Sequence, residues 1–141
     1  MKICYIADAG SIHTQKWVRY FANGGHEVYL ISSNATTQDV FPNVNLYRIK
    51  SFQGIRGVNY LLSIIQIKKI MNKINPDILH AHYMTDNGFW GALSGFHPFI
   101  VTAWGSDILV RPRESRLSKW MVKFVLKQAD MITADSEDLR Q

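Results

Sequence analysis

Cysteine is scarce in this sequence: Cys4 is the only one among 141 residues, so an internal disulfide is excluded. Cys4 lies in an apolar stretch, where a thiol behaves as a small buried hydrophobe, and a reducing cytosol suits such a chain. Long apolar runs are also missing, since none approaches the ~18 residues of a membrane span, and the N-terminus does not resemble a signal peptide. We therefore expect a cytoplasmic protein.

Charge is the next feature that the sequence has little of. Charged residues make up 19% of the chain and hydrophobic residues 47%, a balance that excludes disorder and fits one domain with a sizeable core. The formal net charge is +5. A basic balance favours an anionic partner, and composition alone leaves phosphate, nucleic acid, a lipid surface and a merely solvated basic surface open.

Short apolar stretches alternate with helical patterns along the whole chain. The predicted strands are 2–7, 27–32, 45–50, 77–82, 98–104 and 130–135, and helical patterns lie at 17–21, 58–74, 87–95 and 116–128. Alternating strands and helices form a mostly parallel sheet with helices on both faces. The sequence predicts a single α/β domain over 1–141, Rossmann-like and doubly wound.

The last residues predict one more helix. Ser136 suits its N-cap, and Glu137 and Asp138 suit its first turn. Because the sequence stops at Gln141, a few residues into this helix, we expect the domain to be truncated.

The loop after the first strand is rich in small residues. Ligands of doubly wound sheets bind outside the carboxyl ends of the strands, which selects the segments 8–14, 80–88 and 102–111. Gly10 and Ser11 would let a ligand approach the backbone, and the following helix would direct N–H groups toward it. His13 could donate a hydrogen bond or a proton, or could simply be solvated. The loop has neither the G-x-G-x-x-G pattern nor the G-x-x-x-x-G-K-[ST] pattern.

Two histidines end the fourth predicted strand. His80 and His82 lie on the same side of it, because side chains alternate along a strand, and Tyr83 follows at its end. A zinc site would need a third ligand, and no Cys or Glu has suitable spacing, so we expect no metal. We predict that His82 bonds a polar ligand and that His80 is partly structural. Two histidines satisfied by packing are the alternative.

The fifth predicted strand ends in Trp104, Gly105, Ser106 and Asp107. A tryptophan at a strand terminus offers a flat face on which sugars stack, and Gly105 permits a turn or a close approach. Ser106 and Asp107 can bond ligand hydroxyls or the local backbone. This segment predicts a sugar-binding position, with a buried tryptophan before an Asx-type turn as the alternative.

The helix predicted over 116–128 is basic and amphipathic. Its basic face holds Arg116, Lys119, Lys123 and Lys127, and its apolar side holds Leu117, Trp120, Met121, Phe124 and Val125. Such a helix packs its apolar side into the core, or it lies on an anionic membrane, which would make the protein peripheral on the inner face. We expect no nucleic acid, because the lysines are not interleaved with exposed aromatics along a groove.

Four motifs together resemble the N-terminal domain of family 4 glycosyltransferases of the GT-B fold. They are KICYIAD…SIHTQKWVRYFANGGHEVYLIS, INPDILHAHY, VTAWGSD and ADMITADSEDL, in the family's order and spacing. The resemblance implies two Rossmann-like domains facing across a cleft, of which this chain is the acceptor-binding one. It also implies a nucleotide-sugar donor held by a C-terminal domain absent from this chain, a sugar or lipid-linked acceptor, and no cofactor in this domain.

The reaction implied by the resemblance moves a sugar from a nucleotide-sugar to an acceptor hydroxyl, with retention of configuration and without a metal. The sequence contains no Asp-x-Asp pair, which metal-dependent glycosyltransferases of the other major fold use. We expect a role in the synthesis of surface polysaccharides or glycolipids, and an inactive isolated domain. The alternative is a non-catalytic flavodoxin-like ligand-binding module, whose receiver-type members would want clustered acids at the strand ends.

The resemblance also assigns residues one by one. Gly10 and Ser11 match the family's loop near the acceptor and the sugar phosphate, and His82 matches its histidine after the fourth strand. The stretch 102–107 matches the family's T-x-H-G-x-D, but Trp104 stands where many members have a histidine. An indole cannot transfer a proton, so we expect His13 or His82 to supply the missing contact and assign both as catalytic.

Overall fold

The computed structural model describes residues 1–34, 41–50 and 56–134. Six strands of these residues form one parallel sheet in the order β3-β2-β1-β4-β5-β6. The strands are β1 (Lys2–Ile6), β2 (Glu27–Ser32), β3 (Val44–Arg48), β4 (Ile78–His82), β5 (Phe99–Ala103) and β6 (Met131–Ala134). This order is that of the doubly wound Rossmann fold, which confirms the predicted fold class.

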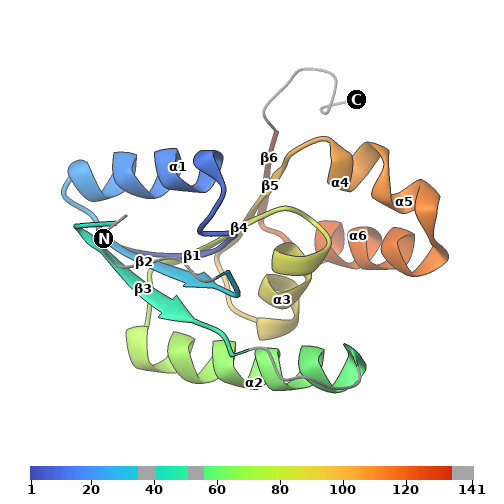
Figure 1. Ribbon diagram of the computed structural model, residues 1–141, viewed down its shortest axis with the longest axis horizontal. Helices are drawn as coiled ribbons and strands as arrows, with labels where there is room; N and C mark the ends of the chain where they lie inside the picture. The colour runs from blue at the N-terminus through green and yellow to red at the C-terminus, as the bar shows by residue number, and fades with distance from the viewer. Residues whose placement is uncertain (35–40, 51–55, 135–141) are drawn as a thin grey trace.

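Helices cover both faces of the sheet (Figure 1). They are α1 (Ile12–Asn23), α2 (Arg56–Ile74), α3 (Asp86–Ser94), α4 (Ser106–Leu109), α5 (Arg111–Glu114) and α6 (Arg116–Gln128). One face packs against α1, whose Val18 is fully buried, and the other packs against α2, α3 and α6. None of these described helices is both long and apolar enough to cross a membrane.

The predicted strands agree with the observed ones within two residues at each end. The helix predicted over 116–128 has those bounds, and β3 lies at the sheet edge, where its alternating pattern suits exposure of one face. Sequence analysis missed α4 and α5, because four residues are too few to show a helical period. The helix predicted to begin at Ser136 lies outside the described residues.

The periodic pattern of α6 divides between the core and the surface. Met121 and Val125 are buried against the sheet, as the core interpretation expects. Leu117 and Trp120 are 65% and 54% exposed, so the core interpretation describes only part of the apolar side. The apolar side of α6 covers a larger area than the sheet face can bury. The N-terminal half of the helix extends beyond the sheet, and its side chains Leu117 and Trp120 stay exposed.

The strand order reverses at the junction of β1 and β4, where the chain stops adding strands on one side of β1 and starts adding them on the other. The chain leaves β1 through α1 toward β2, and it leaves β4 through α3 toward β5, so the two connections lie on opposite faces. Their loops separate at the carboxyl ends of the two strands and leave a crevice there. This crevice is the position at which the fold predicts a ligand.

Candidate functional site

A cavity of about 660 Å³ opens at the crevice between β1 and β4. It is bordered by the loops that follow β1, β2, β4 and β5. Half of the ten predicted site residues lie on its wall: Ser11, His13, His82, Tyr83 and Trp104. The strand ends therefore bring together side chains that are far apart in the sequence. One of them, Trp104, follows β5, which is not one of the two strands that flank the crevice.

His82 points into this site from the last position of β4. The side chain is 2% exposed, and its Nδ1 lies 3.5 Å from the Thr14 hydroxyl of α1. Its Nε2 is buried without a hydrogen-bond partner. Burial, together with the neighbouring His80 and His13, lowers the pKa of His82 to about 3. The ring is therefore neutral at physiological pH, and it offers its free nitrogen as a hydrogen-bonding group.

His80 lies beneath the cavity rather than on its wall. Its Nε2 is 2.7 Å from the Thr102 hydroxyl of β5, which is itself 2.6 Å from the Thr133 hydroxyl of β6. The ring packs 5.1 Å from the rings of both Tyr5 and Trp17. Burial lowers the pKa of His80 to about 4, so this histidine is a neutral, hydrogen-bonded part of the core. The hydrogen bond to Thr102 and the packing against the two rings account for the structural part of the role predicted for His80.

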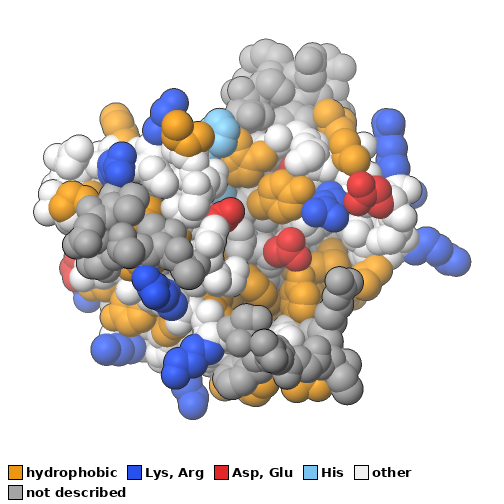
Figure 2. Space-filling model, in the orientation of Figure 1, with side chains coloured by type: hydrophobic (Ala, Val, Ile, Leu, Met, Phe, Trp, Pro, Cys, Tyr) orange, Lys and Arg blue, Asp and Glu red, His pale blue; other side chains and the backbone are white. Residues whose placement is uncertain are grey.

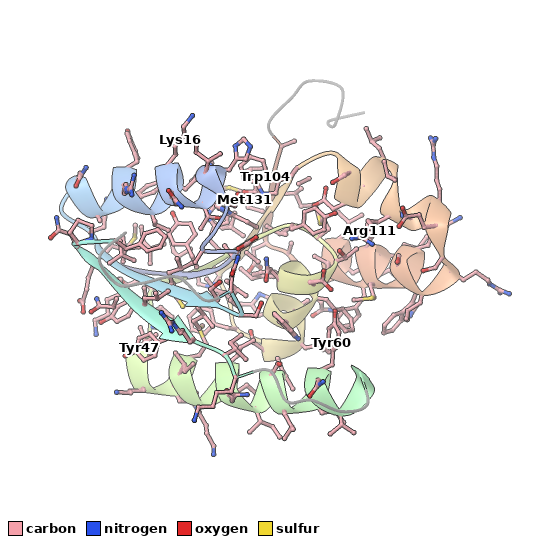
Figure 3. The ribbon with its side chains drawn as sticks, viewed as in Figure 1. Lys16, Tyr47, Tyr60, Trp104, Arg111 and Met131 are labelled. Carbon is pink, nitrogen blue, oxygen red and sulfur yellow. The ribbon has the colours of Figure 1, made fainter. Side chains whose placement is uncertain are left out.

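Trp104 forms an aromatic wall of the cavity beside the start of α1 (Figure 3). Its ring centroid lies 4.6 Å from that of His13 and 5.4 Å from that of His82. His13 is exposed at the mouth, whereas His82 is buried at the base. The indole therefore lies between the two histidines that the sequence selects, and all three rings can contact one ligand.

Asp107 holds two of the cavity loops together and does not face the cavity. Its carboxylate is fully buried and accepts hydrogen bonds from the backbone N–H of Met84, at 2.7 Å, and of Trp104, at 3.0 Å. Burial raises the pKa of Asp107, and these N–H groups act in the opposite direction. Gly105 supplies the sharp turn before it, with a φ of 90° that side chains other than glycine rarely adopt.

Tyr83 has a strained backbone at the rim of the cavity. Its φ is 79°, a conformation that costs a non-glycine residue about 1–2 kcal/mol. The phenol hydroxyl lies 3.2 Å from the hydroxyl of Ser106 and accepts a bond of 3.5 Å from Nε of Arg111. Tyr83 thereby connects the loop after β4 to the short helices α4 and α5, and the predicted contact residue Ser106 acts here through Tyr83.

The loop after β2 contributes polar groups that the sequence analysis overlooked. Asn34 donates from Nδ2 to the Asp8 carboxylate at 2.6 Å, and the same carboxylate accepts from the backbone N–H of Gly10 at 2.8 Å. A Cβ at Gly10 would come within 2.7 Å of the Asn34 side-chain amide, so a larger residue here would have to displace that amide. The predicted Gly10 thus shapes the rim without lining the cavity.

The opposite wall is formed by the start of α3. Asp86 accepts a hydrogen bond of 2.5 Å from the Tyr60 hydroxyl, and Asn87 donates to the backbone carbonyl of His82 at 3.0 Å. Trp90 is 8% exposed, and its Nε1 is buried without a hydrogen-bond partner. Among the described residues that line the cavity, two are acidic and none is Lys or Arg.

A model of the glycosyl transferase 4-like family matches residues 2–136. The chain belongs to this family. A curated glycosyltransferase of Methanocaldococcus jannaschii, itself described as uncharacterized, is 25% identical over 118 residues, which are 81% of this chain and 33% of that protein. The chain therefore spans about a third of the length of this family relative.

Solved structures share the fold at low sequence identity. A putative UDP-N-acetylglucosamine 2-epimerase from Listeria monocytogenes has a TM-score of 0.75 at 13% identity, over 99% of this chain and 40% of that one. MurG from Acinetobacter baumannii has a TM-score of 0.68 at 12% identity, over 98% of this chain and 43% of that one. These neighbours are GT-B fold enzymes, and each matches over fewer than half of its residues.

The resemblance to the family accounts for the loops after β1, β4 and β5 but not for the rest of the wall. Thr14 and Asp86 fall inside segments that the sequence analysis selected, although their residue types carried no specific signal. Asn34 had a usable signal, because it follows the strand 27–32, whose carboxyl end meets the same sheet edge. Trp90 had none, since a tryptophan in a helix is ordinarily a core residue. In the described residues, no three His, Cys, Asp or Glu side chains are grouped to hold a metal ion.

Proposed function

We propose that this glycosyl transferase 4-like chain is the acceptor-side domain of a glycosyltransferase. The cavity between β1 and β4 would hold an acceptor hydroxyl, and a C-terminal domain would hold the nucleotide-sugar. The observation that carries the proposal is one wall of the cavity, where the Trp104 ring lies within 5.4 Å of two histidine rings, beside the unpartnered Nε2 of His82. A flat indole next to hydrogen-bonding groups suits a sugar ring.

The charges at the cavity favour a neutral ligand with many hydroxyls. Asp8 and Asp86 place carboxylates on opposite walls, and Asn34 and Asn87 add amides. Carboxylates and amides accept hydrogen bonds from hydroxyls, whereas carboxylates repel a phosphate. The net charge of +5 is therefore carried elsewhere on the domain, and this cavity suits the acceptor sugar better than the donor diphosphate.

The two histidines would have different roles toward the acceptor. His82 is neutral and buried, so its Nε2 would hold an acceptor hydroxyl in position by a hydrogen bond. His13 is exposed at the mouth, where it could exchange a proton with the reacting hydroxyl. Transfer would depend mainly on positioning and on stabilisation of the departing diphosphate, with retention of configuration. The product would be a surface polysaccharide or a glycolipid made on the cytoplasmic side.

We also propose that α6 meets the inner face of an anionic membrane. Leu117 and Trp120 are exposed, and Arg116, Lys119 and Lys123 are exposed around them. Exposed apolar side chains next to basic ones suit the boundary between lipid headgroups and acyl chains. This contact would bring a lipid-linked acceptor to the same side of the domain.

The indole N–H groups provide a direct test of the acceptor cavity. In an isotope-labelled sample of this chain, Trp90 and Trp104 report on the cavity, whereas Trp17 and Trp120 lie outside its wall and serve as internal controls. We expect members of a panel of methyl glycosides and disaccharides to shift the signals of Trp90 and Trp104 only. His13→Ala should weaken this binding. A panel that shifts none of the four signals, or only those of Trp17 and Trp120, contradicts the proposal.

A second experiment tests whether the donor site lies in another domain. This chain, incubated with a set of nucleotide-sugars and with the sugars that bind it, should form no transfer product. Robust transfer by residues 1–141 alone would refute a donor site in another domain.

A further inference from the structure

A second cavity, of about 750 Å³, adjoins the first at the start of α3. Ser33, Asp86 and Trp90 line both cavities, so one ligand can occupy the two at once. The other walls of the second cavity come mainly from the N-terminal parts of α2 and α6. Both volumes lie within the roughly 300–1,000 Å³ that is usual for small-molecule sites, so each cavity can hold a ligand unit of its own.

The second cavity repeats the side-chain chemistry of the first. Both combine aromatic rings with hydroxyl and amide groups, and Asp86 is the only charged side chain among the described residues that line the second cavity. Its aromatic rings are those of Tyr60, Phe89 and Trp90, and its further polar side chains are Asn59, Ser63, Ser115 and Ser118. Such walls suit the C–H faces and the hydroxyl groups of a sugar ring, so the two cavities suit the same class of ligand.

The aromatic rings form a continuous wall along the second cavity. The ring centroid of Tyr60 lies 5.5 Å from that of Trp90 and 6.2 Å from that of Phe89. Figure 3 shows Tyr60 between α2 and α3, and Figure 2 shows hydrophobic side chains gathered on this face between α2 and α6, with acidic side chains beside them. Positions for stacking therefore continue from the junction of the two cavities into the second one.

Asp86 and Trp90 mark this junction, four residues apart on one face of α3. Asp86 accepts the Tyr60 hydroxyl through Oδ1 at 2.5 Å, so the carboxylate is held in place and its Oδ2 can accept from a ligand hydroxyl. Trp90 is 8% exposed, and its Nε1–H has no hydrogen-bond partner among the described residues, although a buried donor ordinarily finds one. The junction thus offers an acceptor and a donor to a ligand that crosses it.

We propose that the second cavity binds a second sugar unit, and that the acceptor is an oligosaccharide of at least two units. This inference rests on the proposed acceptor-side function and deepens it by giving the acceptor a size and a direction. The terminal unit, which receives the new sugar, would lie against Trp104 in the first cavity, and the preceding unit would lie against Tyr60 and Phe89. Asp86 and the Nε1–H of Trp90 would bond atoms on either side of the glycosidic linkage.

A disaccharide should therefore bind more tightly than its terminal sugar alone. The probes are the methyl glycoside that shifts the Trp104 signal most, and disaccharides that carry this sugar at the non-reducing end, one for each linkage. We expect one linkage to bind at least about tenfold more tightly than the methyl glycoside, because two additional net hydrogen bonds correspond to about that factor. The other linkages should gain less, since they direct the second unit away from the second cavity.

Methionine methyl groups report on the second cavity separately. Of the five methionines, Met121 lines the second cavity, and the other four line neither cavity and serve as internal controls. In an isotope-labelled sample, the methyl glycoside should shift the indole signal of Trp104 and leave the methyl signal of Met121 unchanged. The disaccharide that binds most tightly should shift both signals.

Two asparagines of α2 supply a matched pair of variants. Asn59 lines the second cavity, whereas Asn72 is exposed and lines neither cavity. Alanine favours a helix more than asparagine does, so both alanine variants should fold. We expect Asn59→Ala to weaken disaccharide binding about fivefold, the contribution of one net hydrogen bond, and to leave the affinity for the methyl glycoside unchanged. Asn72→Ala should change neither affinity, and equal disaccharide affinities in the two variants would overturn the inference.

The readouts separate this inference from the function on which it rests. If the methyl glycoside shifts Trp104 but no disaccharide binds more tightly or shifts Met121, the acceptor cavity stands and the second sugar site is refuted. If the cyclohexyl glycoside of the same sugar binds at least as tightly as every disaccharide, the second cavity prefers an apolar unit, and the second sugar site is refuted as well. If disaccharides shift Met121 while no sugar shifts Trp104, the proposed function fails, and the two-unit acceptor fails with it.

Discussion

Acidification should destabilise this domain through His80 and His82. The pKa values of the two buried imidazoles are lowered from 6.5 to about 4 and about 3, mainly by burial. A base whose pKa is lower in the folded state binds more protons when the chain unfolds. Its contribution to stability is therefore complete above pH 6.5, and it is lost progressively as the pH falls toward the folded-state pKa.

The size of the effect follows from the pKa of the unfolded state. The experiment compares about pH 7.5 with about pH 5, and the lower value lies roughly 1.5 units below the unfolded-state pKa of 6.5. Each histidine that stays neutral in the fold then lowers the free energy of unfolding by about 2 kcal/mol. The two together should cost about 4 kcal/mol, a large part of the 5–15 kcal/mol that is typical of a folded domain. The result depends little on the folded-state values, because both lie at or below about 4.

Urea unfolding of the chain at the two pH values measures this cost. His80→Gln and His82→Gln should each reduce the loss of unfolding free energy by about 2 kcal/mol, and the double variant should reduce it by about 4 kcal/mol. Each variant is compared with itself at the two pH values, so damage from the substitution cancels. Asp107, whose raised pKa acts in the opposite direction, is present in every variant and cancels as well.

A double variant that loses as much stability on acidification as the wild type would refute the reasoning. It would mean that the imidazoles take up protons within the fold, and that a neutral His82 no longer explains the hydrogen-bonding role assigned to it. If only one of the two single variants reduces the loss of stability, the whole pH dependence belongs to the ring that this variant replaces.

Two further changes test the loops and the membrane contact. Asp107→Asn replaces an oxygen that accepts backbone hydrogen bonds with an amide donor, so we expect a loss of about 2–3 kcal/mol and a thermal midpoint lower by roughly 5–10 °C in circular dichroism; an unchanged midpoint would contradict the role of Asp107 as a loop tie. Trp120→Ser should reduce co-sedimentation with phosphatidylglycerol vesicles at least about threefold, without affecting sugar binding, whereas equal binding to phosphatidylcholine vesicles would rule out an anionic surface.

The fold could be predicted from sequence because it depends on patterns that repeat along the chain. Apolar stretches such as 27–32 identify strands, and parallel connection then brings their carboxyl ends to one edge. His82 ends β4 and Trp104 directly follows the neighbouring strand β5, so their proximity follows from the pairing of these two strands. The exposure of Leu117 did not follow, because it depends on how far α6 extends past the sheet, which periodicity does not encode.

Hydrogen bonds between loops were outside the reach of sequence reasoning. The sequence assigned Asp107 to a ligand or to the local backbone, and the structure shows that it also accepts from Met84, which is 23 residues away. His80 was grouped with His82 because both side chains leave the strand on one side. Their surroundings separate them: Thr102 satisfies His80, whereas the Nε2 of His82 is left without a partner.

The unpartnered nitrogens connect stability with binding. Among the described buried side chains, only the Nε2 of His82 and the Nε1 of Trp90 have no hydrogen-bond partner, and both residues line the first cavity. A buried polar group left unpaired costs about 1–3 kcal/mol, so a ligand atom that pairs with either nitrogen would strengthen binding there. A ligand that reaches both nitrogens recovers this energy, whereas one that reaches neither does not. A ligand that reaches both would extend from His82 at the base of the crevice to Trp90 in α3.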